Sequence, residues 1–303
     1  MTIGIKVKTP VKYSILIIAL IILLVVINKR CYFENLFIYM INIHSHVIVG
    51  KDGWLFYDDG IKSIVFPPKK VNLLNIINTA NFLKSCGVRI IIVPVPDKEM
   101  FYNSKIADFD SFVFKNYIEF ILKLKQQQVE VCNVLEVLNE IKFNAEELYF
   151  KNDSHWSSNA INVVSNAVVN QFLQKEMNHS CQRYELIDTV GTFYPDLLKL
   201  LRNKEILETY RGKTSAEINN TCNSTDSSIV VFGDSFAEAC SSINGKFGDI
   251  ISFCLQKPVK TVFKLGAGYK GYKYLRSYKK VCGHKTKIAI WLFAFRSQLD
   301  RPD

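Results

Sequence analysis

Apolar runs alternate with amphipathic segments along most of the chain. The near-continuous β-branched run VRIIIVPVP (88–96) is typical of a parallel strand covered on both faces. Residues 129–134 predict a short strand, and three further apolar runs predict buried ones. These three runs are SSIVVF (227–232), VKTVFKL (259–265) and KIAIWLF (287–293).

Helical periodicity fills the intervals between the predicted strands. It is clearest over residues 158–174, where Ile161, Val164, Val168 and Phe172 lie along one face. Further helices are expected over residues 72–86, 113–127, 236–256 and 269–281. Strands that alternate with helices predict an α/β fold, with a parallel sheet between two helical layers.

Two segments fall outside this alternation. Asp52-Gly53 lies between apolar runs and predicts a tight hairpin turn. Residues 176–226 are polar and are expected to be irregular, apart from a short helix around residues 196–208. No internal repeat or low-complexity tract interrupts the chain, so we expect one α/β domain over residues 48–303.

The N-terminal segment has the layout of a membrane signal anchor. Basic residues flank the apolar run YSILIIALIILLVVI (13–27) on both sides. As a helix this run spans about 22 Å, and snorkelling lysines can cover the rest of a hydrocarbon core about 30 Å thick. No small-residue cleavage site follows the run. We therefore expect a basic flank and an uncleaved anchor in residues 1–30, a connector over 31–47, a cytoplasmic N-terminus and export of the remaining domain across the membrane.

The chain is basic, with 38 lysines and arginines against 28 acidic residues. This balance suits an anionic partner such as lipid head groups, an acidic polymer or nucleic acid, and export argues against nucleic acid. Ten basic residues lie within residues 257–287, interleaved with tyrosines. They form either a solvated face or a surface for an anionic glycan or lipid. The eight cysteines contain no C-x-x-C pair, so we expect no metal site and no cofactor.

The candidate nucleophile is Ser235. IVVFGDSF (229–236) runs from a buried strand through Gly233 and Asp234 into a predicted helix. Ligands of open α/β sheets gather at the carboxyl ends of strands, and helix N-termini there favour developing negative charge. The alternative is that Asp234 or Ser235 only caps the helix. The G-x-S-x-G turn of α/β-hydrolases is absent.

A serine nucleophile needs a base, and the base needs an orienting group. No Asp or Glu occurs from residue 250 to 299, so an Asp just ahead of a C-terminal His is excluded. The best partner lies upstream in YFKNDSHWSSNAI (149–161), where Asp153 and His155 can approach each other in a loop.

The residues after His155 predict how this loop would be fixed. Ser157 is a candidate N-cap for the following helix, and Trp156 and Ile161 occupy the positions of a hydrophobic staple. The alternative is a solvated turn that precedes a helix and has no chemical role.

Several motifs occur together in a fixed order. They are GKDGWLF (50–56), PDK (96–98) with Tyr102, DSHW (153–156), GDSF (233–236) and IAIWLFAFRSQL (288–299). Together, over about residues 48–299, they resemble the alginate O-acetyltransferase proteins of the AlgJ and AlgX type, which are SGNH-hydrolase-like enzymes.

The resemblance implies a three-layer, flavodoxin-like SGNH fold, a periplasmic location and transfer of acetyl groups to a polysaccharide. By this match the nucleophile, the base and its orienting partner are Ser235, His155 and Asp153. Leu292 and Phe295 stand where the family usually has a glutamate, and Pro195 stands where a glycine is commoner. These departures leave the identity of the glycan open.

The expected mechanism is two-step acyl transfer through an acyl-serine. The Ser235 N–H and an N–H of the loop LGAGY (265–269), at Gly266 or Gly268, would hold the oxyanion, although plain turn glycines explain this loop equally well. Further candidates for substrate contacts are Lys98, Tyr269 and Arg296.

Three functions stay open. A polysaccharide O-acetyltransferase would need an acetyl donor, supplied across the membrane by a membrane-bound O-acyltransferase partner. A carbohydrate esterase would use the same triad with water as the acceptor. A non-catalytic assembly or glycan-binding protein would not need Asp153, His155 and Ser235, so these residues argue against it.

Overall fold

The computed structural model describes residues 43–44, 46–106, 111–140, 148–178, 184–201, 208–217, 228–240, 246–271, 273 and 285–298. The predicted anchor lies outside these residues, as does nearly all of the predicted connector. No helix in the described part is long and apolar enough to cross a membrane. The anchor therefore stays a prediction. Residues His44–Asp303 form one compact unit.

A five-stranded sheet with the order β5-β4-β10-β8-β9 forms the centre of this unit, and all its neighbouring strands are parallel. The strands are β4 (Arg89–Val95), β5 (Glu130–Val131), β8 (Ile229–Gly233), β9 (Val259–Phe263) and β10 (Ile288–Ala294). β4, β5 and β9 lie within the runs predicted from the sequence, and β8 and β10 each extend one residue past theirs. All seven residues of β10 are buried, which explains why its sequence is apolar without alternation.

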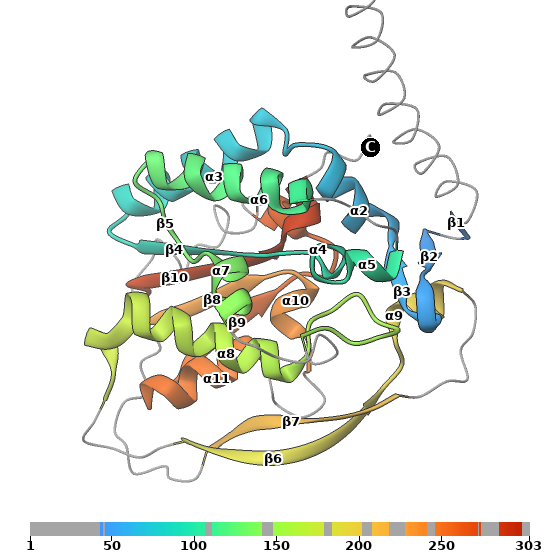
Figure 1. The fold of residues 1–303 in the computed structure, drawn as a ribbon. Coiled ribbons are helices and arrows are strands. Elements are labelled where there is room, and N and C mark those ends of the chain that lie inside the picture. The colour runs from blue at the N-terminus through green and yellow to red at the C-terminus, as the bar shows by residue number, and fades with distance from the viewer. Residues whose placement is uncertain are drawn as a thin grey trace, which may run out of the picture. The chain divides into compact units, whose positions relative to one another are not determined.

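Helices cover both faces of the sheet (Figure 1). One layer contains α2 (Asp58–Val65), α3 (Lys70–Ser85) and α6 (Lys115–Gln126). The opposite layer contains α7 (Val134–Glu140), α8 (Ser158–Val168) and α11 (Phe247–Leu255). This confirms the predicted α/β fold with a parallel sheet. The predicted helix over residues 236–256 is two helices, because α10 (Ser235–Glu238) ends well before α11 begins.

The predicted tight turn at Asp52 and Gly53 joins β2 (Val47–Val49) to β3 (Leu55–Tyr57), which pair antiparallel. Its turn residues form a short 3₁₀ helix, η1 (Lys51–Gly53). Asp52 and Gly53 have φ of 57° and 73°. Glycine adopts this left-handed region without strain, and aspartate does so at small cost. The turn prediction is therefore confirmed. β1 (Ile43–His44) completes this small sheet.

The prediction of irregular structure over residues 176–226 was wrong in one respect. β6 (Tyr184–Phe193) and β7 (Glu208–Glu217) pair antiparallel along ten residues each. This ribbon contacts α8 and α11 rather than the main sheet (Figure 1). β6 is largely exposed, so its sequence lacks the clear apolar alternation of a half-buried strand. Of the predicted helix near residue 200, the structure describes α9 (Asp196–Leu200).

The remaining short elements lie mostly around the carboxyl edge of the sheet. They are α4 (Lys98–Phe101), α5 (Asn103–Ile106), η2 (Ser111–Phe114), η7 (Gly268–Lys270) and η8 (Phe295–Gln298), while η4 (Val169–Leu173) and η5 (Gln174–Glu176) extend α8. The carboxyl ends of β4, β8 and β10 thus lead into α4, α10 and η8. Because parallel strands end at the same edge, these three turns meet there.

Candidate active site

The turn after β8 presents Ser235 at the carboxyl edge of the sheet. Oδ1 of Asp234 accepts the Phe236 N–H at 2.9 Å, and Oδ2 accepts the Ala294 N–H at 2.9 Å. Asp234 therefore caps α10 and also ties the turn to the end of β10. A Cβ on Gly233 would lie 2.3 Å from Cβ of Ala237, so only glycine lets α10 fold back so closely. Burial raises the pKa of Asp234.

The Asp-x-His loop brings the two predicted partners into contact. Oδ1 of Asp153 lies 2.7 Å from Nδ1 of His155 and also accepts the His155 N–H at 2.8 Å. The side chain of Ser157 accepts the Ala160 N–H at 3.3 Å, which confirms the predicted N-cap of α8. The indole Nε1 of Trp156 donates to the Phe236 carbonyl at 3.0 Å. This hydrogen bond connects the loop that contains His155 (the histidine loop) directly to the turn that contains Ser235 (the serine turn).

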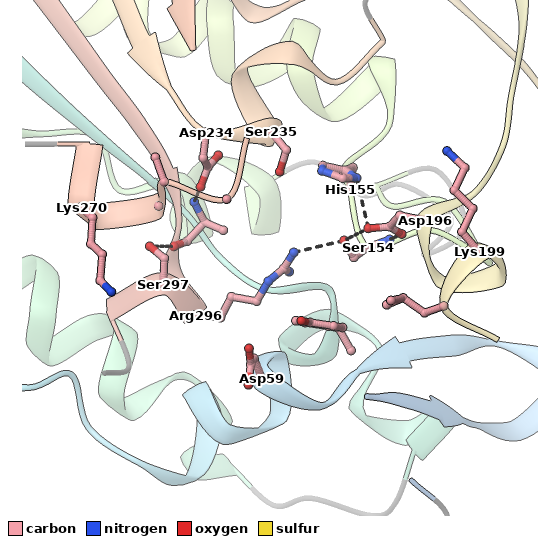
Figure 2. Close-up of a pocket in the computed structure, with 16 residues that line it drawn as sticks. Asp59, Ser154, His155, Asp196, Lys199, Asp234, Ser235, Lys270, Arg296 and Ser297 are labelled. Carbon is pink, nitrogen blue, oxygen red and sulfur yellow. Dashed lines mark hydrogen bonds and ion pairs between the residues drawn. The ribbon is translucent and has the colours of Figure 1, made fainter. Parts of the chain in front are cut away.

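The electrostatics of this pair suit a base and its orienting group. Burial by itself lowers the pKa of His155, but the carboxylate of Asp153 outweighs it and raises that pKa. Burial opposes ionisation of Asp153 as well, yet His155 and the backbone donors lower the pKa of its carboxyl. Nε2 of His155 has no hydrogen-bond partner among the described residues. Ser235 and His155 both line the same cavity (Figure 2).

Asp196, in α9, also belongs to this cluster, and sequence reasoning missed it. Its carboxylate accepts the N–H of Ser154 at 2.7 Å and the hydroxyl of Ser154 at 2.6 Å. Oδ2 lies 3.6 Å from Nδ1 of His155, and the Asp196 N–H donates to Oδ2 of Asp153 at 2.7 Å. Burial and the Asp153 charge raise the pKa of Asp196. In the sequence, an Asp at the start of a short helix carries no sign of this contact.

Asp153, His155 and Asp196 could also be considered as metal ligands, because their ligand atoms lie within 4.8 Å of one another. All four carboxylate oxygens already accept hydrogen bonds from N–H or O–H groups. Oδ1 of Asp153 also lies 2.7 Å from Nδ1 of His155, so the histidine nitrogen of the group is directed at a carboxylate oxygen. The arrangement therefore fits hydrogen-bonded carboxylates better than a metal centre, and the absence of a metal stays a prediction.

Arg296 lies in η8, directly after β10. Nη1 donates to Oδ1 of Asp97 at 3.2 Å, and Nη2 donates to Oγ of Ser154 at 3.1 Å. The guanidinium also lies 5.2 Å from the ring centre of Tyr57 and 5.1 Å from that of Phe236. Burial raises the pKa of Asp97 to about 8, although Arg296 opposes the shift. Arg296 thus connects the β4 turn, the histidine loop and the serine turn.

These groups line one cavity of about 540 Å³ (Figure 2). Its lining residues are Tyr57, Asp59, Ser154, His155, Asp196, Lys199, Leu200, Asp234, Ser235, Gly266, Ala267, Gly268, Lys270, Ala294, Arg296 and Ser297. The lining includes three basic side chains, of Lys199, Lys270 and Arg296, and the carboxyl groups of Asp59, Asp196 and Asp234. The structure therefore brings together Ser235, His155, Gly266, Gly268 and Arg296, with Asp153 buried directly behind the imidazole.

The two loop glycines have different structural requirements. Gly266 and Gly268 have φ of 69° and 47°, in the left-handed region. A Cβ on Gly268 would lie 2.3 Å from Cβ of Ser297, whereas a Cβ on Gly266 would meet nothing within 4 Å. Packing against Ser297 therefore accounts for Gly268 without any chemical role. The side chain of Tyr269 lies outside what the structure describes.

The structure corrects our expectation for Lys98. This residue is fully buried and does not line the cavity. Its ammonium donates to the carbonyls of Leu55 at 2.7 Å, Lys151 at 2.6 Å and Asp153 at 3.2 Å. It also lies 4.9 Å from the ring centre of Trp54. Lys98 thus joins β3 to the histidine loop as a structural cation, which a sequence cannot distinguish from a substrate-binding lysine.

A serine turn and an Asp-x-His loop at the carboxyl edge of a parallel sheet define an SGNH-hydrolase-like α/β protein. Residues 47–294 match the family model described as "SGNH hydrolase-like domain, acetyltransferase AlgX", and the chain belongs to this family. The resemblance stated from the motifs is therefore confirmed.

Solved structures show the same fold. The O-acetyltransferase domain of Pseudomonas putida AlgJ has a TM-score of 0.64 at 19% identity, over 85% of this chain and 93% of that chain. Pseudomonas aeruginosa AlgX has a TM-score of 0.63 at 17% identity, over 82% of this chain and 61% of that chain. At these identities the likeness establishes the fold alone. No curated protein matches the sequence.

Proposed function

We propose that this protein is a polysaccharide O-acetyltransferase that works through a Ser235–His155–Asp153 triad and an acetyl-serine intermediate. The observation that carries the proposal is the hydrogen bonding of the two ring nitrogens of His155. Asp153 holds Nδ1 of His155 at 2.7 Å, Nε2 has no hydrogen-bond partner among the described residues, and His155 and Ser235 line the same cavity. Membership of an acetyltransferase family supports acyl chemistry.

In the first half-reaction, Nε2 of His155 takes the proton of the Ser235 hydroxyl as Oγ attacks the acetyl carbonyl of the donor. The tetrahedral oxyanion then collapses, the bond to the leaving group breaks, and His155 returns the proton to that group. In the second half-reaction His155 deprotonates a sugar hydroxyl, which attacks acetyl-Ser235. Collapse releases the acetylated sugar, and the proton returns to Oγ.

The oxyanion would be held by the backbone N–H of Ser235 and by an N–H of the glycine loop. Such donors typically contribute about 3 kcal/mol each to stabilising a transition state. Gly266 is the better candidate for the loop donor, because Gly268 is already explained by its packing against Ser297. Arg296 would hold the histidine loop in position through its hydrogen bond to Oγ of Ser154.

The same proposal includes the partners and location expected from the sequence. The N-terminal helix would anchor the chain in the cytoplasmic membrane with the domain in the periplasm. A membrane-bound O-acyltransferase would supply the acetyl group, and an exported polysaccharide would accept it. Lys199, Lys270 and Arg296 at the cavity suit an acceptor that carries negative charge.

The test combines mutation with trapping of the intermediate. The full chain is given a chromogenic acetyl ester without an acceptor, and an acetyl adduct on the peptide that contains Ser235 is sought by mass spectrometry. Ser235→Ala should abolish both the adduct and acetyl release, whereas Ser85→Ala, at the exposed end of α3, should retain both. Full acetyl release by Ser235→Ala would refute the proposed triad.

A carbohydrate esterase is the second candidate, because water and a sugar hydroxyl can accept the acetyl group from the same intermediate. Candidate oligosaccharides added to the same assay separate the two functions. A transferase should acetylate the right oligosaccharide at the expense of free acetate. Release of acetate alone, with every acceptor offered, would identify an esterase.

A further inference from the structure

A set of exposed apolar side chains gathers on the helical layer formed by α2, α3 and α6. Between 37% and 53% of each of these side chains is exposed. They are Phe66, Val71, Leu74, Phe82, Ile118 and Leu122. Contiguous exposed apolar surface on a soluble domain typically marks a site of interaction with a protein or a membrane.

The helices themselves show that these side chains share one outer face. Ile76 and Leu83 of α3, like Leu124 of α6, are fully buried on the opposite side, against the sheet. α3 and α6 lie side by side in the layer (Figure 1). Nδ2 of Asn116 in α6 donates to the Ile64 carbonyl of α2 at 2.8 Å. The end of α2, which leads into Phe66, therefore lies beside the start of α6.

The two helices that carry most of this face are basic. α3 contains no acidic residue, and α6 contains only Glu119, which lies 3.8 Å from the ammonium of Lys123. The exposed lysines in and next to these helices are Lys69, Lys70, Lys84, Lys115, Lys123 and Lys125. We call this surface of exposed apolar side chains and lysines the α3–α6 face.

We infer that the α3–α6 face binds the surface of a membrane that contains anionic phospholipid. Apolar side chains flanked by lysines are typical of helices that lie in the membrane interface, where the lysine stems remain over apolar surface and the ammonium groups meet phosphate. Protein–protein interfaces differ in their charged residues, because lysine is depleted in them. The inference depends neither on the proposed enzyme activity nor on the predicted anchor.

Tryptophan fluorescence tests this contact in the full chain. The native tryptophans, Trp54, Trp156 and Trp291, are all buried, with exposures of 3%, 0% and 1%. A Leu122→Trp variant therefore adds one exposed reporter on the α3–α6 face. Vesicles are made with brominated acyl chains, which quench tryptophan in contact with lipid. They contain either phosphatidylcholine alone or phosphatidylcholine mixed with phosphatidylglycerol.

The expected result is quenching of the Leu122→Trp reporter that requires phosphatidylglycerol. Reversing three charges, with Lys115→Glu, Lys123→Glu and Lys125→Glu together, should abolish that quenching. Val190→Trp is the control, because this position is 62% exposed but lies on β6, on the other side of the domain. It should show little quenching in either lipid. An N-terminal anchor would tether the chain in both lipids, so it cannot produce the difference between them.

Two outcomes would overturn the inference. One is equal fluorescence of the Leu122→Trp reporter in the two lipids. The other is a blue-shifted reporter without lipid together with a dimer in analytical ultracentrifugation, which would assign the face to a second copy of the chain. If Leu122→Trp does not fold, as judged by circular dichroism, Leu74→Trp on α3 provides the same measurement.

Discussion

The indole of Trp156 donates a hydrogen bond to the backbone carbonyl of Phe236 at 3.0 Å. Trp156 directly follows the predicted base, and Phe236 directly follows the predicted nucleophile. The two rings also contact each other, with centroids 6.1 Å apart. One side chain therefore sets the separation between two loops that are 80 residues apart in the sequence.

The first prediction concerns this bond. Trp156→Phe should lower kcat/KM for a small acetyl ester by about tenfold or more, because modest misplacement of catalytic groups has large effects on rate. The free energy of unfolding should fall by about 1–3 kcal/mol, since the Phe236 carbonyl loses its partner. Trp291→Phe is the matched control in β10. It should reduce stability but leave kcat/KM nearly unchanged, and an equal loss of kcat/KM would contradict a positioning role for Trp156.

The second prediction concerns Asp196 and the pH dependence of activity. The proposed base works as neutral imidazole, so activity rises with pH through the pKa of His155. Burial lowers this pKa, but the negative charges of Asp153 and Asp196 raise it. Asp196→Asn removes one of these charges, so the acid limb of the kcat/KM profile should move to lower pH.

Asp59→Asn is the control for this shift. Asp59 also lines the cavity, but its carboxylate pairs with Lys62 at 3.1 Å. Its substitution should leave the acid limb where it is. If Asp196→Asn lowered kcat/KM at every pH but left the acid limb in place, Asp196 would only support the structure of the loop.

The third prediction concerns the buried carboxyl of Asp97. Its pKa is raised by burial to about 8 in the folded protein, against about 4 for an ordinary aspartate. The folded state therefore holds a proton that the unfolded state has lost. The contribution of this group to stability is fully present below about pH 4 and is lost as the pH rises through about 8.

Asp97→Asn keeps the neutral form at every pH. In urea titrations between about pH 4 and about pH 8, its free energy of unfolding should fall less steeply than that of the unmodified protein. The difference in slope is at most about 1.4 kcal/mol per pH unit for one proton. Parallel curves for the two proteins would show that Asp97 ionises normally in the fold.

The fourth prediction concerns Lys98. Lys98→Met removes the donor for three carbonyl groups in the interior, and unpaired buried acceptors cost about 1–3 kcal/mol each. The chain should therefore unfold at a clearly lower temperature. Lys105→Met is the control, since Lys105 pairs with the exposed Asp52 at 2.6 Å, and it should change the melting temperature little. Equal melting temperatures for the two variants would restore Lys98 as a candidate for substrate contact.

Most of the sheet could be predicted because its strands are covered on both faces. A strand such as β10, buried at every residue, has a continuous apolar sequence that few other structures require. The β6–β7 ribbon could not be predicted in the same way. Its residues face solvent along most of β6, so polar and apolar positions carry little information about pairing.

The residues of the site likewise differ in whether the sequence around them could predict their contacts. Asp153 and His155 could be paired from the sequence, because two residues in one short loop are close in any conformation of that loop. Asp196 approaches the same imidazole from a helix 41 residues further along the chain. Lys98 was misassigned for the related reason that burial depends on tertiary packing. Nothing local distinguishes a lysine that binds backbone carbonyls from one that binds a ligand.

The position of β10 has a consequence for how the chain reaches its folded state. β10 is the last strand of the sheet in the sequence, yet it lies between β4 and β8 at the centre. While the chain is being synthesised, β4–β5 and β8–β9 can form only two separate pairs. Only β10 joins these two pairs into one sheet. The site is built on the ends of β4, β8 and β10, so a chain that stops before residue 288 has neither a complete sheet nor a complete site.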